Sequence, residues 1–297
     1  MEVTMRPNDF DGYWDAVESE LGRFAAAPEL ELLPSRCTEF SNVYAVRLTS
    51  VGPYRIFGYL SVPSGSGSFP GLLLTPRYGS VNHLPHLDDR KRYVVLVLMH
   101  RGQRLADQPF AATYPGLLTH GIESPESYVY RGIVADCLRG AEFLASRPEV
   151  DTNRIGIMGD DLAVITASRR TDFTAAYISG LTFFRLMDAR EYSDAYPIEE
   201  VNDYLRAFPE RRDSVARTLA YFDPAHHASR VSARSLLSVG SGQRNGADWL
   251  LPLTEQLGDQ VEPYTVTHEG GTDHDQVDSW MAGQLGVAPI PRLWTVE

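Results

Sequence analysis

Two adjacent aspartates, Asp160 and Asp161, follow an apolar run at residues 154–158 and precede a helical pattern. The segment Gly159-x-Asp161-x-Ala163 has the small-x-nucleophile-x-small spacing of the sharp strand-to-helix turn that presents a catalytic side chain. Such a turn is so tight that small residues must flank the side chain it presents. The usual occupant is serine, and here it is aspartate. Any chemistry at this turn must therefore be chemistry of a carboxylate.

Buried strands and helices alternate around this turn. Continuous apolar runs at 71–75, 93–99 and 154–158 are typical of strands that are buried on both faces of a parallel sheet. Further strands are expected at 175–179, 235–239 and 263–267, and helices at 125–147 and 162–170. The alternation predicts an α/β fold with a doubly wound, mostly parallel sheet.

The chain of 297 residues is expected to form one domain over residues 1–297. It opens with a helix at residues 8–26 and a hairpin of strands at 43–50 and 54–62, so that this amino-terminal part covers about residues 8–62. Residues 181–228 interrupt the strand–helix rhythm and predict a helical insertion over the carboxyl ends of the strands, where ligands bind in open α/β sheets. Its aromatic residues, Phe184 among them, are expected to form the core of those helices or to line the pocket.

The composition excludes several classes of partner. With 27 basic and 39 acidic residues, the formal net charge of −12 argues against nucleic acid and anionic membranes. Cys37 and Cys137 show no metal-binding spacing, and Cys137 falls on a helical pattern as a small core residue. No apolar segment is long enough to be a signal peptide core or a membrane span. A cytoplasmic protein without a metal is expected.

The chain resembles the acetyl xylan esterase and cephalosporin-C deacetylase branch of the α/β-hydrolases. The resemblance is carried by a series of short motifs in the same order along the chain. They are Phe10-x-x-Tyr13-Trp14, Arg101-Gly102-Gln103, Gly121-Ile122-x-x-Pro125-Glu126-x-Tyr128-x-Tyr130-Arg131, Asp136, Val150-Asp151-x-x-Arg154-Ile155, Leu219-x-Tyr221-Phe222-Asp223 and Val239-Gly240. The resemblance implies an α/β-hydrolase fold with a helical insertion, no organic cofactor, and a tendency to form homo-oligomers.

The same resemblance implies where a catalytic triad would lie. The nucleophile falls at Asp161, and the acid falls near Gln243, with Asp248 as a displaced substitute. The histidine belongs in a loop after the last strand, where His268 and His274 are both available. His274 is favoured because a loop precedes it and residues from Gln276 onward look helical.

The resemblance also implies the groups that would surround the reacting centre. The oxyanion would be bound by the Leu162 N–H and by the loop that carries Tyr78. Asp160, beside the turn, is expected to contact substrate together with Gln243, Arg101 and Gln103. Arg101 is also expected to tie the neighbouring loops through charge-assisted hydrogen bonds.

Three functions remain open for such a site. With Asp161 as general base, assisted by His274, the protein would be a lyase that eliminates acetate from a small acetylated molecule, as in tetronate natural-product biosynthesis. In the second, Asp161 would be the nucleophile of an epoxide hydrolase or dehalogenase. In the third, the protein would bind ligands without catalysis, with Asp161 as a helix N-cap. The lyase is the preferred prediction, and serine esterase activity is not expected.

Overall fold

A nine-stranded sheet organises the molecule. The structure, a computed structural model, describes residues 5–79, 83–240, 246–267 and 273–290. The strands are β1 (Glu29–Leu32), β2 (Ser41–Thr49), β3 (Arg55–Pro63), β4 (Phe69–Leu74), β5 (Val94–Met99), β6 (Val150–Gly159), β7 (Phe173–Ile178), β8 (Arg234–Val239) and β9 (Val261–Thr265). Their order is β1-β2-β3-β5-β4-β6-β7-β8-β9. Pairs from β5 to β9 are parallel, whereas β1, β2 and β3 pair antiparallel at one edge. The predicted α/β fold with a mostly parallel sheet is confirmed.

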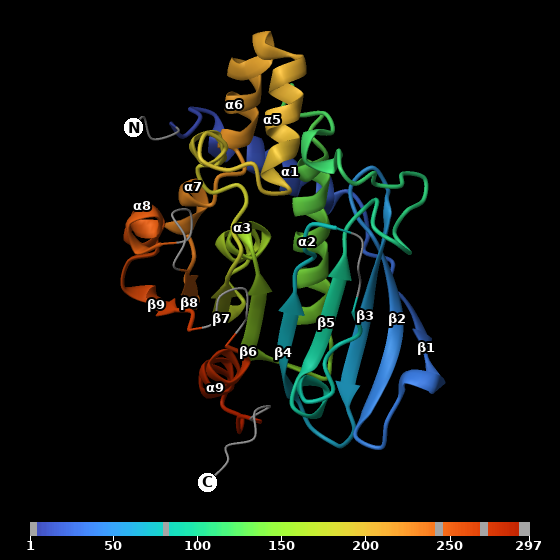
Figure 1. The fold of residues 1–297 in the computed structure, drawn as a ribbon. Coiled ribbons are helices and arrows are strands. Elements are labelled where there is room, and N and C mark those ends of the chain that lie inside the picture. The colour runs from blue at the N-terminus through green and yellow to red at the C-terminus, as the bar shows by residue number, and fades with distance from the viewer. Residues whose placement is uncertain (1–4, 80–82, 241–245, 268–272, 291–297) are drawn as a thin grey trace.

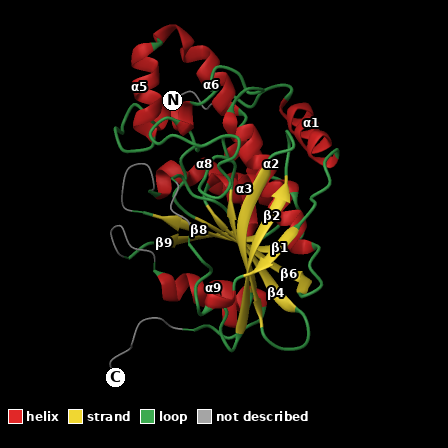
Figure 2. Cartoon of the chain, turned by 90° about the vertical axis from the view of Figure 1, so that its right-hand side faces the viewer, coloured by secondary structure: helices red, strands yellow, loops and turns green. Residues whose placement is uncertain are grey.

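Helices cover both faces of the sheet. The longer ones are α1 (Phe10–Gly22), α2 (Val129–Ala145), α3 (Asp161–Arg169), α8 (Ala247–Leu257) and α9 (His274–Leu285). Figure 2 shows α9 on one face, with α2, α3 and α8 on the opposite face. No helix among the described residues is long and apolar enough to cross a membrane.

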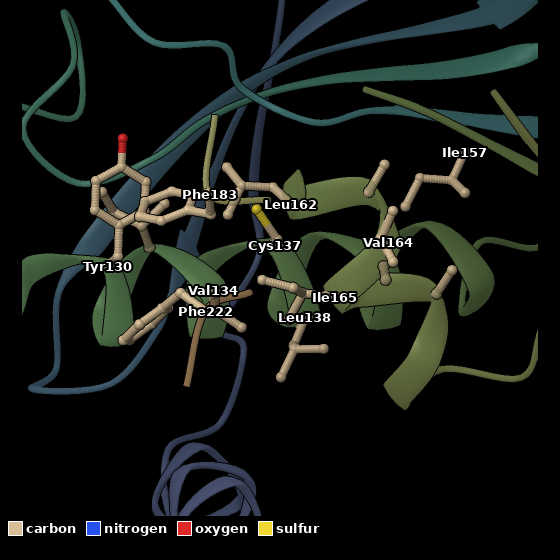
Figure 3. Close-up of a cluster of buried hydrophobic side chains, with 14 of the residues drawn as sticks. Tyr130, Val134, Cys137, Leu138, Ile157, Leu162, Val164, Ile165, Phe183 and Phe222 are labelled. Atoms are coloured by element: carbon tan, nitrogen blue, oxygen red, sulfur yellow. The ribbon is translucent and has the colours of Figure 1, made fainter. Parts of the chain in front are cut away.

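The main core lies between the sheet and the helices α2 and α3. Because side chains alternate along a strand, Ile155 and Ile157 of β6 face this side, whereas Met158 faces α9. Figure 3 shows Leu162 of α3 beside Cys137 of α2. Cys137 is fully buried there, as the sequence predicted.

The predicted helical insertion is present. It contains α4 (Leu186–Ala189), α5 (Ile198–Ala207), α6 (Arg212–Ala220) and α7 (Ala225–Ala228). Figure 1 shows α5 and α6 beyond the carboxyl ends of the central strands. This is the end of the sheet at which β6 passes into α3, so the insertion lies over the turn that carries the two aspartates.

Candidate functional site

The turn between β6 and α3 has no positive φ at either of its aspartates. Asp160 is the N-cap of α3, with φ −103° and ψ −143°, and Asp161 is the first residue of the helix. Neither residue is among the non-glycine residues with positive φ, which are Ala27, Leu105 and Arg185. A nucleophile elbow presents its side chain from a strained conformation. The turn therefore keeps the position of an elbow without a positive φ at either aspartate.

Gly159 is required by the close approach of β4. A Cβ atom at Gly159 would lie 1.9 Å from Oγ1 of Thr75, the residue that follows β4. Thr75 is held in place because its backbone N–H donates to the carbonyl oxygen of Met158 at 3.0 Å. The pattern at the turn predicts a small residue at position 159, and the neighbouring Thr75 gives a second reason for it.

Asp161 faces the interior of the protein. Its side chain is 1% exposed and accepts hydrogen bonds from the N–H groups of Thr182 at 2.6 Å, Phe183 at 3.0 Å and Phe184 at 3.1 Å. Burial and the adjacent Asp160 raise the pKa of Asp161, and the N–H donors oppose that shift. Both carboxylate oxygens bind the segment that leads into the insertion. The orientation expected for Asp161, toward a ligand, is not the one found.

Asp160 is the accessible carboxylate of the pair. Its side chain is partly exposed, and Oδ1 accepts a hydrogen bond from the Leu162 N–H at 3.0 Å. Desolvation raises the pKa of Asp160 to about 6, although the Leu162 N–H and the Arg77 guanidinium oppose the shift. The group can therefore accept a proton near neutral pH.

The two residues expected to touch substrate beside Asp161 lie elsewhere. The Leu162 N–H, expected as an oxyanion donor, is used by Asp160, and its side chain lies in the core shown in Figure 3. Phe184 is 3% exposed and packs edge-on against Trp249, with ring centroids 6.4 Å apart. Neither Leu162 nor Phe184 is among the described residues that line the large cavity of the molecule.

That cavity begins at the carboxyl ends of the central strands. It has a volume of about 520 Å³, within the range typical of small-molecule sites. Gly159, Arg77, Tyr78, Gln103 and His274 are among the residues that line it. The structure therefore brings Tyr78, Gln103 and His274 together at the cavity, beside Gly159, whereas Asp160 is not among the residues that line it.

Tyr78 is held by a carboxylate that the sequence did not single out. Its hydroxyl donates to Oε1 of Glu200 on α5, and burial with this contact raises the pKa of Tyr78 well above its usual range. Oε2 of Glu200 accepts from the N–H groups of Gly116 at 2.8 Å and Leu118 at 3.1 Å. Glu200 is 7% exposed. Carboxylates are almost never buried without a partner, so its burial is the structural sign that Glu200 holds Tyr78.

Gln103 positions the loop that carries Tyr78. Its amide nitrogen donates to the carbonyl oxygens of Arg77 at 2.9 Å and Gly79 at 2.5 Å, and its amide oxygen accepts from the His100 N–H at 3.1 Å. Gln103 thus lines the cavity and ties the loop after β4 to the loop after β5.

Arg101 lies outside the cavity. Its guanidinium forms an ion pair with the buried Asp136 at 2.8 Å, and Nη2 donates to the carbonyl oxygen of Val51 at 3.1 Å. The role expected for Arg101 in tying loops fits these contacts, whereas contact with a ligand in the large cavity does not.

His274 lines the cavity as the first residue of α9. The helix therefore begins at His274 and not near Gln276, as the sequence suggested. Gln243 and His268 lie outside the described residues. Asp248 is exposed in the first turn of α8.

Comparison with known proteins gives a consistent family. The family model described as acetyl xylan esterase (AXE1) matches residues 1–244. An acetyl esterase, Axe7A of Xylanibacter ruminicola, is 24% identical over 258 residues, which are 80% of this chain and 57% of that relative. The chain thus spans little more than half the length of this relative.

Two solved structures share the fold over almost the whole chain. The acetyl xylan esterase of Paenibacillus sp. R4 has a TM-score of 0.83 at 23% identity and covers 97% of both chains. Acetyl xylan esterase 1 of Thermoanaerobacterium sp. JW/SL YS485 has a TM-score of 0.81 at 21% identity, over 96% of this chain and 95% of that one. With these neighbours, the predicted α/β-hydrolase fold is confirmed.

These comparisons overturn the predicted reaction. The matching family and the relatives are esterases, and esterases are hydrolases. The predicted lyase is therefore wrong, and the same family evidence contradicts the expectation that serine esterase activity is absent. The epoxide hydrolase, the dehalogenase and the inactive binding protein fit these relatives no better. The position of Asp161 agrees, because its carboxylate binds backbone N–H groups and has no part in the cavity. Since the family model covers most of its length, the chain belongs to the acetyl xylan esterase family.

Proposed function

We propose that this protein hydrolyses the acetate ester of a small hydroxylated molecule, with water attacking the ester directly and Asp160 acting as general base. The observation that carries the proposal is the position of Asp160. It is a partly exposed carboxylate whose pKa desolvation raises to about 6, and it directly follows Gly159, which lines the cavity. Family membership supports an ester as the substrate.

The sequence at the turn favours water over a covalent intermediate. Residues 160 and 161 are both aspartate, so the turn itself offers no hydroxyl group. Asp161 is held by three backbone N–H groups, which leaves Asp160 as the carboxylate of the turn that can exchange protons with solvent or substrate.

The reaction can be written with Asp160 and with groups that line the adjacent cavity. Asp160 takes a proton from water while the water oxygen forms a bond to the carbonyl carbon of the ester. The carbonyl oxygen becomes negatively charged and faces the Arg77 guanidinium, which lines the cavity. The bond to the alcohol oxygen then breaks, and His274 or the protonated Asp160 returns a proton to it. The products are acetic acid and the free alcohol.

Replacement of Asp160 by asparagine tests this role. Because a general base contributes about 10²- to 10⁴-fold, we expect Asp160→Asn to lower kcat/KM for 4-nitrophenyl acetate by about 100-fold or more. Asparagine remains a good N-cap, so the melting temperature should stay close to that of the unmodified protein. The matched control is Asp213→Asn, which changes an exposed aspartate in the first turn of α6 and should leave kcat/KM unchanged.

The pH dependence of the rate gives a second readout. A general base works in its deprotonated form, so kcat/KM should rise with pH through about 6, the pKa of Asp160. A folded Asp160→Asn variant with an unchanged rate and the same pH profile would contradict the proposal.

A further inference from the structure

The loop after β4 carries a charged group that the proposed reaction uses. Arg77 and Tyr78 of this loop both line the cavity. The positive charge of Arg77 also acts on Asp160, because it opposes the rise in the pKa of that carboxyl. In the proposed reaction the Arg77 guanidinium faces the negative charge that develops on the ester oxygen, and such a group is most effective when it is held in place beforehand. The rate should therefore depend on what holds this loop.

The loop is held at two separate points. At the backbone, Nε2 of Gln103 donates to the carbonyl oxygens of Arg77 at 2.9 Å and of Gly79 at 2.5 Å. Tyr78 lies between these two residues in the chain, and its hydroxyl donates to Oε1 of Glu200 on α5. The backbone of the loop is thus fixed by Gln103, and its one long aromatic side chain is fixed by the helical insertion.

The ring of Tyr78 is packed as well as hydrogen-bonded. It lies edge-on against the ring of Tyr114 at a centroid distance of 5.2 Å and against that of Tyr196 at 5.4 Å. Edge-to-face contacts of this kind are favourable and limit the orientations open to a ring. A change at the Tyr78 hydroxyl is therefore passed on to the backbone of the loop.

Glu200 is itself tied to the main body of the fold. Oε2 of Glu200 accepts hydrogen bonds from the N–H groups of Gly116 at 2.8 Å and Leu118 at 3.1 Å. The carbonyl oxygen of Leu118 accepts in turn from the hydroxyl of Tyr128 at 2.7 Å. Tyr128 is the buried N-cap residue of α2. The position of Tyr78 is thus referred, through Glu200, to a helix that packs on the main core.

Stability alone is a weak explanation for these contacts. A buried carboxylate and a buried phenol lose their hydration, and the hydrogen bonds between them recover little more than that loss. A pair of apolar side chains would join the same segments about as well. Hydrogen bonds differ from apolar contacts because they also fix a distance and a direction. Contacts of this kind suit a segment whose exact position affects the reaction.

From these contacts we infer that Glu200 is a positioning residue: through Tyr78 it holds the loop after β4 so that the Arg77 guanidinium faces the place where negative charge develops. Glu200 is not among the described residues that line the cavity, so it acts through Tyr78 and not on the substrate. This role rests on the proposed function, which gives Arg77 its task. The helical insertion then takes part in the reaction without touching the ester.

Replacement of Glu200 by glutamine tests the role. Glutamine has the size of glutamate but only one acceptor oxygen, so it cannot serve both Tyr78 and the two N–H groups. We expect kcat for 4-nitrophenyl acetate to fall about 10-fold or more, with KM changed by less than about 3-fold, because a misplaced Arg77 affects mainly the transition state. The matched control is Asp203→Asn on the same helix, where the side chain is 82% exposed and the rate should not change.

A second variant covers the case in which Glu200→Gln does not fold. Tyr78→Phe removes the hydroxyl but leaves the Glu200 carboxylate with its two N–H donors. We expect Tyr78→Phe to lower kcat in the same way, and the double variant to be no slower than the slower single variant. A folded Tyr78→Phe protein with an unchanged kcat would overturn the inference.

An arginine background separates positioning from a merely structural role. If Glu200 acts by placing Arg77, then Glu200→Gln should lower kcat/KM by less than about 2-fold in an Arg77→Ala protein, which has no guanidinium to misplace. A structural role predicts the same fold-change in both backgrounds. Equal fold-changes in the two backgrounds would therefore refute the positioning role.

Anion binding distinguishes failure of this role from failure of the proposed function. Titration calorimetry with methylphosphonate, a small tetrahedral anion, needs no hydrolysis. We expect it to bind at least about 5-fold more weakly to Arg77→Ala and to Glu200→Gln than to the unmodified protein. If binding follows this pattern but no acetate ester is hydrolysed, Glu200 still places Arg77 and the proposed hydrolysis is wrong. If esters are hydrolysed and neither rate nor binding depends on Glu200, the positioning role is wrong.

Discussion

Adjacent aspartates at the end of β6 have different environments. Asp161 is buried against the N–H groups of residues 182–184, whereas Asp160 caps α3 and remains partly accessible. The difference arises from the backbone: a non-helical N-cap residue and a first helical residue direct their side chains apart. A carboxylate at position 161 therefore stabilises the loop, and the neighbouring one is available for chemistry.

The two roles predict losses of stability that differ in size. Asp161→Ala would leave three buried N–H groups without an acceptor, which should lower the free energy of unfolding by about 2 kcal/mol or more. Asp160→Ala removes one capping interaction, which should cost about 1 kcal/mol. Urea denaturation of both variants measures the difference. Equal losses, or a larger loss at Asp160, would be inconsistent with the observed contacts.

The sequence could locate this turn but not the direction of its side chains. The spacing Gly159-x-Asp161-x-Ala163 correctly placed the turn between β6 and α3. The partners of Asp161 come from residues about twenty positions later, beyond β7, and no local pattern reveals such a contact. Glu200 was missed for the same reason, because its partner Tyr78 lies 122 residues away.

At the scale of elements, Gly159 at the end of β6 lies close to Thr75, the residue that follows β4. The Thr75 side chain occupies the space that a larger residue at 159 would need. This contact sets the separation of the two strand ends that flank the mouth of the cavity.

Gly159→Ala should therefore force the strand ends apart. We expect a loss of about 1–3 kcal/mol in the free energy of unfolding, the usual cost of overpacking, together with reduced ester hydrolysis. Because the nearest atom is Oγ1 of Thr75, the substitution should cost less in a Thr75→Ala background. A double-mutant cycle in urea measures this coupling, and strictly additive effects would argue against the contact.

Long buried strands and amphipathic helices could be predicted from the sequence. An exposed strand, and a crossover that forms no helix, could not. The strands β4 to β9 and the helices α1, α2 and α3 lie close to their predicted ranges because continuous apolar runs and helical spacing are strong signals. The strand β1 was missed because all four of its side chains are exposed. The open sheet face beside α9 could not be foreseen, since it depends on a crossover that forms no helix in its described residues.

For the whole molecule, buried carboxyls link stability to pH. Asp160 and Asp223 both have a pKa raised to about 6, mainly by desolvation, against about 3.9 in an unfolded chain. Between these values the folded state binds more protons than the unfolded state. Their contribution to stability is thus fully present below about pH 4 and is lost as pH rises through about 6.

This sign can be measured directly. From pH 5 to pH 7, the free energy of unfolding of the unmodified protein should fall relative to that of the Asp160→Asn, Asp223→Asn double variant, which cannot titrate at these positions. Urea denaturation at both pH values gives the two differences. Identical pH dependence in the two proteins would show that neither carboxyl has the raised pKa.

The contact between Glu200 and Tyr78 joins the helical insertion to the loop after β4. Glu200 also accepts hydrogen bonds from two further N–H groups in residues 116–118, so one buried carboxylate serves three segments. A chimaera that takes only the insertion, or only the loop, from a related protein would leave either the Glu200 carboxylate or the Tyr78 hydroxyl buried without its partner. The two segments should accordingly be exchanged together in any recombination of family members, and they should have diverged as a unit.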